Sequence, residues 1–113
     1  MIQTIIIIIL LIAIFAIVTD KINFGTTVYW FHSHNCGHCK KMKHDWYEFE
    51  RLVAYNPNIN AKRIDVDDPN NEAISEEFQV FGVPMIVKVI NGKKYTFQGE
   101  RTASEILKWA SEN

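Results

Sequence analysis

The residues able to do chemistry in this 113-residue chain are concentrated in one short segment, residues 32–44. Both cysteines, Cys36 and Cys39, lie there, and so do all four histidines. Thiolates and imidazole nitrogens bind zinc and copper, whereas two neighbouring thiols can also form and exchange a disulfide. The residue types therefore allow a metal site or a redox site, and the surrounding elements must distinguish them.

The two cysteines have the spacing of a redox pair. Cys36 and Cys39 stand at i and i+3 where a helix is predicted to begin, so their sulfur atoms share one face and can bond. The first thiol lies at the helix N-terminus, where free N–H groups and the helix dipole favour a thiolate. Gly37 and His38 lie between them, and a cationic imidazole at position 38 also stabilises the thiolate. We therefore expect Cys36 to be the nucleophile and Cys39 the resolving thiol.

Two predicted strands and a helix surround this pair. Residues 26–31 are β-branched and aromatic, and their apolar side chains suit a strand that is buried on both faces. Residues 36–55 place apolar side chains at helical spacing. Residues 61–66 form a second strand, and the order strand, helix, strand predicts that the two strands are parallel.

The second half of the chain predicts a hairpin between two helices. A short helix over residues 68–78 opens with an Asp-Pro cap. Strands at residues 85–90 and 93–98 are joined by Asn-Gly, a strong signal for a tight hairpin, and a capping box at residues 102–105 opens the last helix. We predict an α/β protein with a mixed central sheet, a parallel strand pair plus an antiparallel hairpin, flanked by helices.

Three stretches of the chain together are similar to one known family. Cys36-Gly-His-Cys39 has the form of a disulfide isomerase active-site motif. Residues 81–84, Phe-Gly-Val-Pro, are similar to a proline loop of that family, and residues 95–102 are similar to the end of an isomerase domain. Over residues 26–113 the chain resembles thioredoxin-fold proteins, most of all a catalytic domain of protein disulfide isomerase. The resemblance implies a thioredoxin-like fold that lacks the family's first strand and helix, with the N-terminal segment in their place.

The resemblance also implies roles for residues outside the pair. Pro84 would be cis and pack beside the disulfide, and the backbone of Val83 would pair with an extended substrate segment. Arg101 would move toward the site and lower the pKa of Cys39. The chemistry needs no organic cofactor, and its substrates would be the thiols and disulfides of other proteins.

The chain departs from the family pattern at three positions. Trp30 stands where the family has a buried acid that takes the proton of the second cysteine. Asn35 replaces the aromatic residue before the first cysteine, and His44 replaces a proline that kinks the helix. Proton transfer at Cys39 would then use water, Arg101 or a histidine, so we expect slow turnover.

The histidines leave a metal hypothesis open. His32 and His34 could join the two cysteines as two nitrogen and two sulfur ligands for zinc or copper. If the strand continues through them, however, their side chains would point to opposite sides. We therefore expect His32 to pack near the site and His34 to be an exposed loop residue. His44 is expected on a solvated helix face and His38 beside the thiolate, and no metal is assigned.

The N-terminal residues predict a membrane segment. Residues 2–18 carry no charge, and residues 5–12 are all isoleucine or leucine. As a helix they would extend about 26 Å, just short of a hydrocarbon core of roughly 30 Å. We favour a retained single-pass anchor over residues 1–19, and the alternative is a cleaved signal peptide. A linker would follow at residues 20–25, and the thioredoxin-like domain at residues 26–113.

Composition and motifs together define the expected function. A net charge of −1, a pI near 6.4 and the lack of a basic stripe argue against nucleic acid as a partner. We expect a membrane-anchored thiol–disulfide oxidoreductase of oxidase or isomerase type, in an oxidising lumenal or extracytoplasmic compartment and recycled by a further redox partner. The alternatives are a cytosol-facing reductase, a His/Cys metal-binding domain, or a module that holds client proteins with little turnover.

Overall fold

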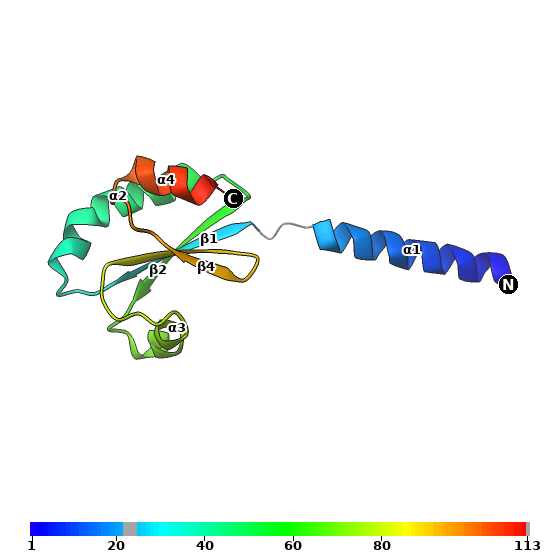
Figure 1. The fold of residues 1–113 in the computed structure, drawn as a ribbon, viewed down its shortest axis with the longest axis horizontal. Helices are drawn as coiled ribbons and strands as arrows, with labels where there is room; N and C mark the ends of the chain where they lie inside the picture. Colours follow the sequence, from blue (N-terminus) through cyan, green and yellow to red (C-terminus); the bar gives the residue numbers. More distant parts are fainter. Residues whose placement is uncertain (22–24, 113) are drawn as a thin grey trace.

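An N-terminal helix precedes the folded domain. The computed structural model describes residues 1–21 and 25–112, and the side chains of residues 14–21 lie outside the described part. Helix α1 (Ile2–Lys21) extends away from the sheet and its helices (Figure 1). Its apolar side chains over residues 5–12 are between 50% and 63% exposed.

The predicted membrane segment and linker are only partly covered by the described residues. Within those residues, no helix combines the length and the apolar character that crossing a membrane requires. The predicted segment, residues 2–18, continues beyond residue 13, where the described side chains of α1 stop. Residues 22–24 of the predicted linker also lie outside the described part. The anchor and the linker therefore stay predictions.

A mixed sheet of four strands forms the centre of the domain as described. Strand β1 (Thr26–His32) pairs in parallel with β2 (Ile59–Asp65). On its other side β1 pairs antiparallel with β3 (Met85–Ile90), and β3 pairs antiparallel with β4 (Lys93–Thr96). The strand order is β2-β1-β3-β4, so β1 is central, as expected for the most apolar run of the sheet. The predicted parallel pair and hairpin are confirmed.

The hairpin turn also follows the prediction. Asn91 and Gly92 have positive φ angles, 51° and 80°, which an Asn-Gly hairpin turn requires. No strand precedes β1 within the described residues, so β2 has a partner on one side only and forms an edge of the sheet.

Helices cover both faces of the sheet (Figure 1). Helices α2 (Gly37–Val53) and α4 (Ala103–Ser111) lie together on one face. The short 3-10 helix η1 (Pro69–Asn71) and helix α3 (Glu72–Glu77) lie on the other. The predicted α/β class, with helices flanking a mixed sheet, is therefore confirmed.

The ends of several elements differ from the sequence prediction by a few residues. Strand β2 begins at Ile59, two residues earlier than predicted, because Ile59 is already in register with the first residue of β1. Helix α2 ends at Val53, two residues earlier than predicted. A turn follows it, in which the N–H of Asn56 donates to the carbonyl of Val53 at 3.0 Å. The predicted helix over residues 68–78 opens as a 3-10 turn, and β4 ends at Thr96.

Two apolar clusters hold these layers together. Because side chains alternate along a strand, Val28 and Trp30 of β1 face α2 and α4, while Phe31 faces α3. Burying each large apolar side chain of this kind contributes about 2 kcal/mol to the free energy of folding. The fully buried large residues of the two clusters are Trp46, Phe31, Phe49, Ile106, Val28 and Val87.

A buried lysine joins the sheet to the last helix. Lys88 of β3 is 6% exposed, and its Nζ donates hydrogen bonds to the carbonyls of Trp109 at 2.7 Å and Glu112 at 3.1 Å. The same Nζ lies 4.9 Å from the centre of the Trp109 ring. The carbonyls near a helix C-terminus carry partial negative charge, so an ammonium group is a favourable partner for them. The Trp109 carbonyl also accepts a hydrogen bond from the N–H of Glu112 at 3.2 Å.

Removing this ammonium group should destabilise the domain. We expect Lys88→Ala to lower the free energy of unfolding by about 2 kcal/mol, because two charge-assisted hydrogen bonds are lost inside the fold. Urea unfolding of the full chain in detergent, followed by tryptophan fluorescence, measures the change. The exposed Lys93→Ala, on the neighbouring strand, is the matched control and should change stability little. Equal stability of Lys88→Ala and Lys93→Ala would contradict this account of the helix end.

Candidate active site

The two cysteines form a disulfide at the first turn of α2. The sulfur atoms of Cys36 and Cys39 are bonded to each other, and the Cα atoms are 5.1 Å apart. Cys36 is the N-cap of the helix, and its Sγ accepts a hydrogen bond from the N–H of Cys39 at 3.1 Å. A sulfur in this position meets N–H groups that the helix leaves without carbonyl partners, and these stabilise negative charge on it. The prediction that Cys36 lies at a helix N-terminus is confirmed.

The two sulfurs differ in their access to solvent. Cys39 is 3% exposed and belongs to the apolar cluster under α2, whereas Cys36 is half-buried at the border of that cluster. Gly37 and His38, between them, are both exposed. A sulfur of another protein can therefore approach Cys36 more easily than Cys39. This difference suits a nucleophile followed by a resolving thiol, and the roles of Gly37 and His38 stay predictions.

The loop before β3 lies against the same apolar cluster. The Val83–Pro84 peptide bond is cis, as the resemblance implied. Val83 is half-buried and packs against both apolar clusters, one of which also borders Cys36. Two residues earlier, the side chain of Phe81 is 93% exposed. The backbone pairing of Val83 with a substrate, beside Pro84, stays a prediction.

Arg101 lies in the segment that leads into α4. Its side chain is exposed and makes no hydrogen bond or ion pair with any residue in the described part of the chain. The start of α4 is tied to α2 by Asp45, whose Oδ1 accepts a hydrogen bond from the N–H of Ala103 at 3.1 Å. The predicted movement of Arg101 toward the disulfide stays a prediction.

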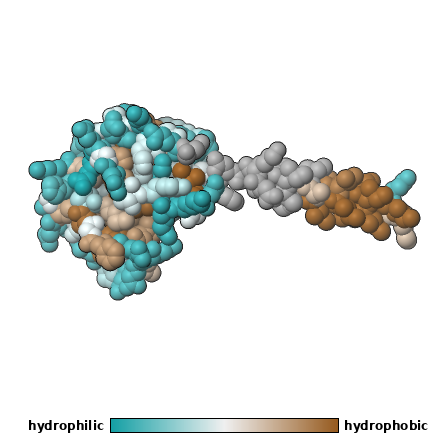
Figure 2. Space-filling model, in the orientation of Figure 1, coloured by the Kyte–Doolittle hydropathy of each residue, from teal (hydrophilic) through white to brown (hydrophobic). Residues whose placement is uncertain are grey.

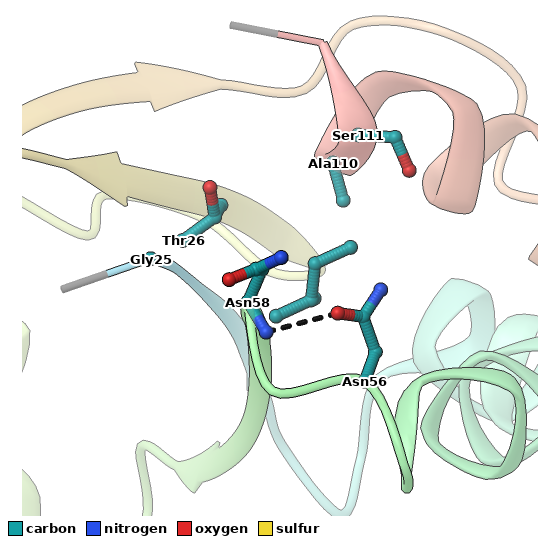
Figure 3. A pocket seen from close by; sticks show the side chains of 7 residues that line it. Gly25, Thr26, Asn56, Asn58, Ala110 and Ser111 are labelled. Carbon is teal, nitrogen blue, oxygen red and sulfur yellow. Dashed lines mark hydrogen bonds between the residues drawn. The ribbon is translucent and has the colours of Figure 1, made fainter. Parts of the chain in front are cut away.

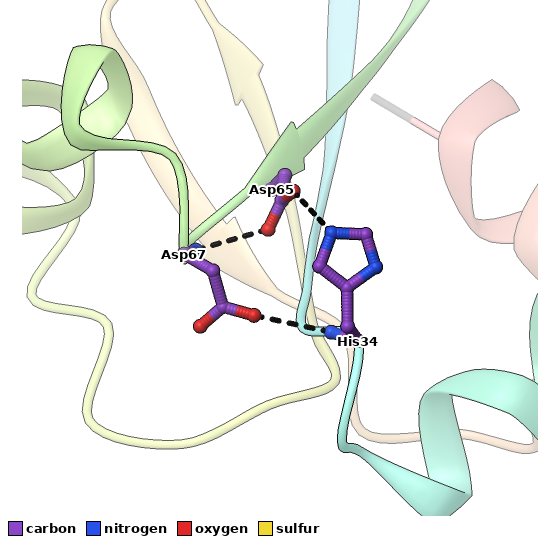
Figure 4. Close-up of side chains that lie close together, drawn as sticks. All are labelled: His34, Asp65 and Asp67. Atoms are coloured by element: carbon purple, nitrogen blue, oxygen red, sulfur yellow. Dashed lines mark hydrogen bonds and ion pairs between the residues drawn. The ribbon is translucent and has the colours of Figure 1, made fainter.

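Polar contacts hold the segment that leads from β1 into α2. The Nε2 of His34 lies 3.0 Å from Oδ2 of Asp65, at the end of β2 (Figure 4). The hydroxyl of Ser33 and the N–H of His34 both donate to Oδ2 of Asp67, at 2.8 and 3.2 Å. Oδ1 of Asp65 accepts in turn from the N–H of Asp67 at 2.9 Å. The turn that precedes Cys36 is therefore pinned to the neighbouring parallel strand.

The sequence reasoning did not identify Asp65 and Asp67 as part of the site. A signal was available, because the C-terminal ends of parallel strands meet at one edge of a sheet and bring the following loops together. His34 is exposed, as predicted, and its ring is directed at Asp65 (Figure 4). The hypothetical set of two histidines and two thiolates is not brought together, since the sulfurs are bonded to each other and His34 faces the acids.

A hollow at the opposite end of β1 is polar and remote from the cysteines (Figure 3). It lies where β1 begins, whereas the disulfide follows the end of that strand. Asn56 and Asn58 line it, and Oδ1 of Asn56 accepts a hydrogen bond from the N–H of Asn58 at 2.9 Å. Gly25, with φ +75°, is required here, because a Cβ would lie 2.6 Å from the carbonyl oxygen of Asn58. This hollow contains no titratable side chain among its described lining residues.

Comparison with known proteins identifies the family. A family model for thioredoxin matches residues 17–112. The chain belongs to the thioredoxin family. It is 30% identical over 79 residues to protein disulfide-isomerase A5 of Bos taurus. The matched region covers 70% of this chain and 15% of that protein. It is 34% identical over 76 residues to the thiol:disulfide interchange protein DsbD of Campylobacter jejuni, covering 65% and 13% of the two chains.

Solved structures support the same assignment for the thioredoxin domain. The first thioredoxin domain of mouse protein disulfide-isomerase A4 matches with a TM-score of 0.65 and 27% identity, over 84% of this chain and 65% of that one. The predicted likeness to an isomerase-type thioredoxin domain is thus confirmed. This chain spans about a fifth or less of the length of the curated relatives that head the comparison.

In this thioredoxin domain Trp30 belongs to the apolar cluster that contains the second cysteine. The side chain is 2% exposed and shares the apolar cluster with Cys39 and Trp46, whose ring centre lies 5.5 Å from that of Trp30. The indole nitrogen of Trp30 is buried without a hydrogen-bond partner. An indole N–H donates but cannot accept a proton, so Trp30 cannot replace the acid that the family pattern places at this position.

The contacts of Asp67 predict a pH-dependent contribution to stability. Hydrogen bonds from the Ser33 hydroxyl and the His34 N–H lower the pKa of the Asp67 carboxyl. A carboxyl whose pKa falls on folding stabilises the fold above its unfolded pKa, about 3.9, and loses this effect as pH falls through the folded value. Asp67→Ala should therefore lower the Tm of the full chain at pH 7, and the difference from the wild type should shrink at acid pH, as pH falls through the folded pKa of Asp67.

Thermal melts followed by circular dichroism, in detergent at both pH values, measure this difference. Glu100→Gln removes an exposed carboxylate outside this network and is the matched control. A Tm difference for Asp67→Ala that is equal at pH 7 and at low pH would show that the Asp67 charge does not stabilise the turn.

Proposed function

We propose that this chain is a thiol–disulfide oxidoreductase that exchanges disulfides with the cysteines of other proteins. The observation that carries the proposal is the Cys36–Cys39 disulfide at the first turn of α2, with one sulfur more accessible and the other buried. Membership of the thioredoxin family supports the same chemistry, and so do relatives named as disulfide isomerases and as a thiol:disulfide interchange protein.

Exchange proceeds through a mixed disulfide. In the reducing direction the Cys36 thiolate attacks a disulfide of the partner, and one partner sulfur leaves as a thiolate. Cys39 then attacks the Sγ of Cys36, the protein disulfide forms, and the second partner sulfur leaves. In the oxidising direction a partner thiolate attacks Cys36, Cys39 leaves, and a second partner thiol completes the exchange. The helix N–H groups at Cys36 stabilise its thiolate in both directions.

We further propose that the domain works as an oxidase or isomerase. His38 lies within the pair, and Lys40 and Lys41 follow it directly, all with exposed side chains. Positive charge beside Cys36 stabilises the reduced thiolate form, which makes the disulfide a stronger oxidant. A separate redox partner would then restore the disulfide after each turnover.

We also propose that residues 2–18 anchor the domain to a membrane, with the domain in an oxidising lumenal or extracytoplasmic compartment. The described part of α1 supports anchoring, because it presents a continuous apolar surface, whereas the face of the domain shown in Figure 2 carries many hydrophilic residues among apolar ones. Exposed apolar surface of this extent is stabilised when lipid removes it from water. The compartment follows from the oxidising character proposed for the pair.

A redox titration of the full chain in detergent tests the proposed activity and its direction. The protein is equilibrated in glutathione buffers, its free thiols are alkylated, and the oxidised fraction is measured by mass spectrometry. We expect a disulfide between Cys36 and Cys39 with a potential near about −180 mV, the range of disulfide isomerases. A potential near about −270 mV would instead indicate a reductase.

Single cysteine variants provide the control for this titration. Cys39→Ser should stop at a mixed disulfide between Cys36 and glutathione, while Cys36→Ser should react much more slowly because Cys39 is buried. If the wild-type cysteines bind glutathione separately and never bond to each other, the proposed function is wrong.

A further inference from the structure

The resolving cysteine needs a proton acceptor. Cys39 is 3% exposed, within an apolar cluster. A thiol in such surroundings keeps its proton more firmly than a solvated one, yet only the thiolate attacks a disulfide. Trp30, which belongs to the same cluster, cannot accept a proton.

A water-accessible cavity of about 530 Å³ reaches Cys39, and residues at the C-terminal ends of β1 and β2 line it. Trp30 and His32 both line it, because residues two positions apart on a strand project from the same face. Lys40 and Lys43 of α2 line it as well. A cavity of this size and polarity accommodates water molecules, so a proton can pass between groups on its wall without direct contact.

His32 is the last residue of β1 and forms part of this wall. Its side chain is half-buried, and its ring stacks on the ring of Trp30, with centroids 4.4 Å apart. No described residue forms a hydrogen bond with the imidazole of His32, so its acceptor nitrogen is available to the cavity.

The surroundings of His32 favour its neutral form. Desolvation by burial is the main cause that lowers its pKa below 6.5, and His34, Arg63 and Lys43 act in the same direction, while Asp65 opposes them. An imidazole in its neutral form at pH 7 has a free lone pair and can take a proton.

The carboxylates and the other basic side chains that line the cavity are already engaged or unsuitable. Asp65 pairs with His34 and also accepts a backbone hydrogen bond, and Asp68 caps η1 through the N–H of Asn70 at 2.9 Å. The lysines and Arg63 are proton donors without acceptor capacity when charged. Positive charge from Lys40 and Lys43 on the cavity wall favours a thiolate at Cys39 but does not remove its proton.

We propose that His32 accepts the proton of Cys39, through water in the cavity, during resolution of the mixed disulfide. This inference rests on the proposed thiol–disulfide exchange and adds a residue to it. The Cys39 proton passes to His32, the Cys39 thiolate attacks the Sγ of Cys36, and the bond between Cys36 and the partner sulfur breaks. The partner leaves as a thiolate that takes a proton from water, and His32 returns its proton to solvent.

Stopped-flow reaction of the reduced full chain, in detergent, with an aromatic disulfide that releases a coloured thiolate separates the two steps. The first phase is attack by Cys36 and depends on reagent concentration, and the second is resolution by Cys39 and does not. We expect His32→Gln to slow the second phase at pH 7 by at least about tenfold and to leave the first within about twofold.

Two further measurements complete the test. The second-phase rate of the wild type should fall as pH drops through the His32 pKa, below 6.5, and this inflection should disappear in His32→Gln. His44→Gln, an exposed histidine on α2, is the matched control and should retain both wild-type phases. The wild-type pH profile needs no substitution, so it tests the proposal even if His32→Gln folds poorly.

Defined outcomes would overturn the inference. Unchanged second-phase kinetics in His32→Gln at every pH would remove His32 from proton transfer. Equal slowing of both phases would show a general effect on the site rather than on Cys39. A wild type that shows no second phase at all would instead contradict the proposed exchange itself, so the two failures are distinguishable.

Discussion

The start of α2 is the constraint on which the rest of the site depends. Cys36 must be the N-cap for its sulfur to meet free helix N–H groups, and the disulfide to Cys39 requires the first turn to be formed. The apolar stripe of α2 fixes this helix on the sheet. Ser33 and His34 fix the turn before it, through Asp65 and Asp67 on the adjacent strand end. The position of Cys36 at the helix N-terminus therefore depends on the parallel strands β1 and β2 ending side by side.

A second consequence concerns the interior beneath the disulfide. Burial of Trp30 extends the apolar cluster and stabilises the domain, but its indole cannot take the proton of Cys39. The proton must then leave by another route, and His32 is the next residue on the same face of the strand. On this face of β1, Trp30 therefore contributes to stability, and His32, two residues later, is available for acid–base chemistry. The arrangement separates them, with the tryptophan buried and the histidine at the wall of a water-accessible cavity.

Local patterns made much of the fold predictable. The Asn91-Gly92 turn and the cap at Thr102 each act over a few residues, and the strand, helix, strand order follows from the apolar pattern within each element. All three are present. Interactions across the fold were not predictable, because they depend on register. Neither the burial of Lys88 under α4 nor the contact of His34 with Asp65 can be read from spacing along the chain.

The same distinction applies to the site. The cysteine pair follows from its own spacing, whereas the orientation of each histidine depends on where β1 ends. His34, after the strand, turns to the acids of the neighbouring loop, and His32, within it, stacks on Trp30. The sequence predicted that His32 packs near the site and that His34 is exposed, and both expectations are confirmed, but it did not predict the contact of His34 with Asp65.

The helix N-terminus should make Cys36 a thiolate in the reduced protein, and the ultraviolet absorbance of the thiolate against pH measures this directly. We expect one thiolate at neutral pH in the reduced full chain, retained in Cys39→Ser and absent in Cys36→Ser. If no thiolate forms until about pH 8.5, the value of a free cysteine, the position of Cys36 on α2 does not activate it.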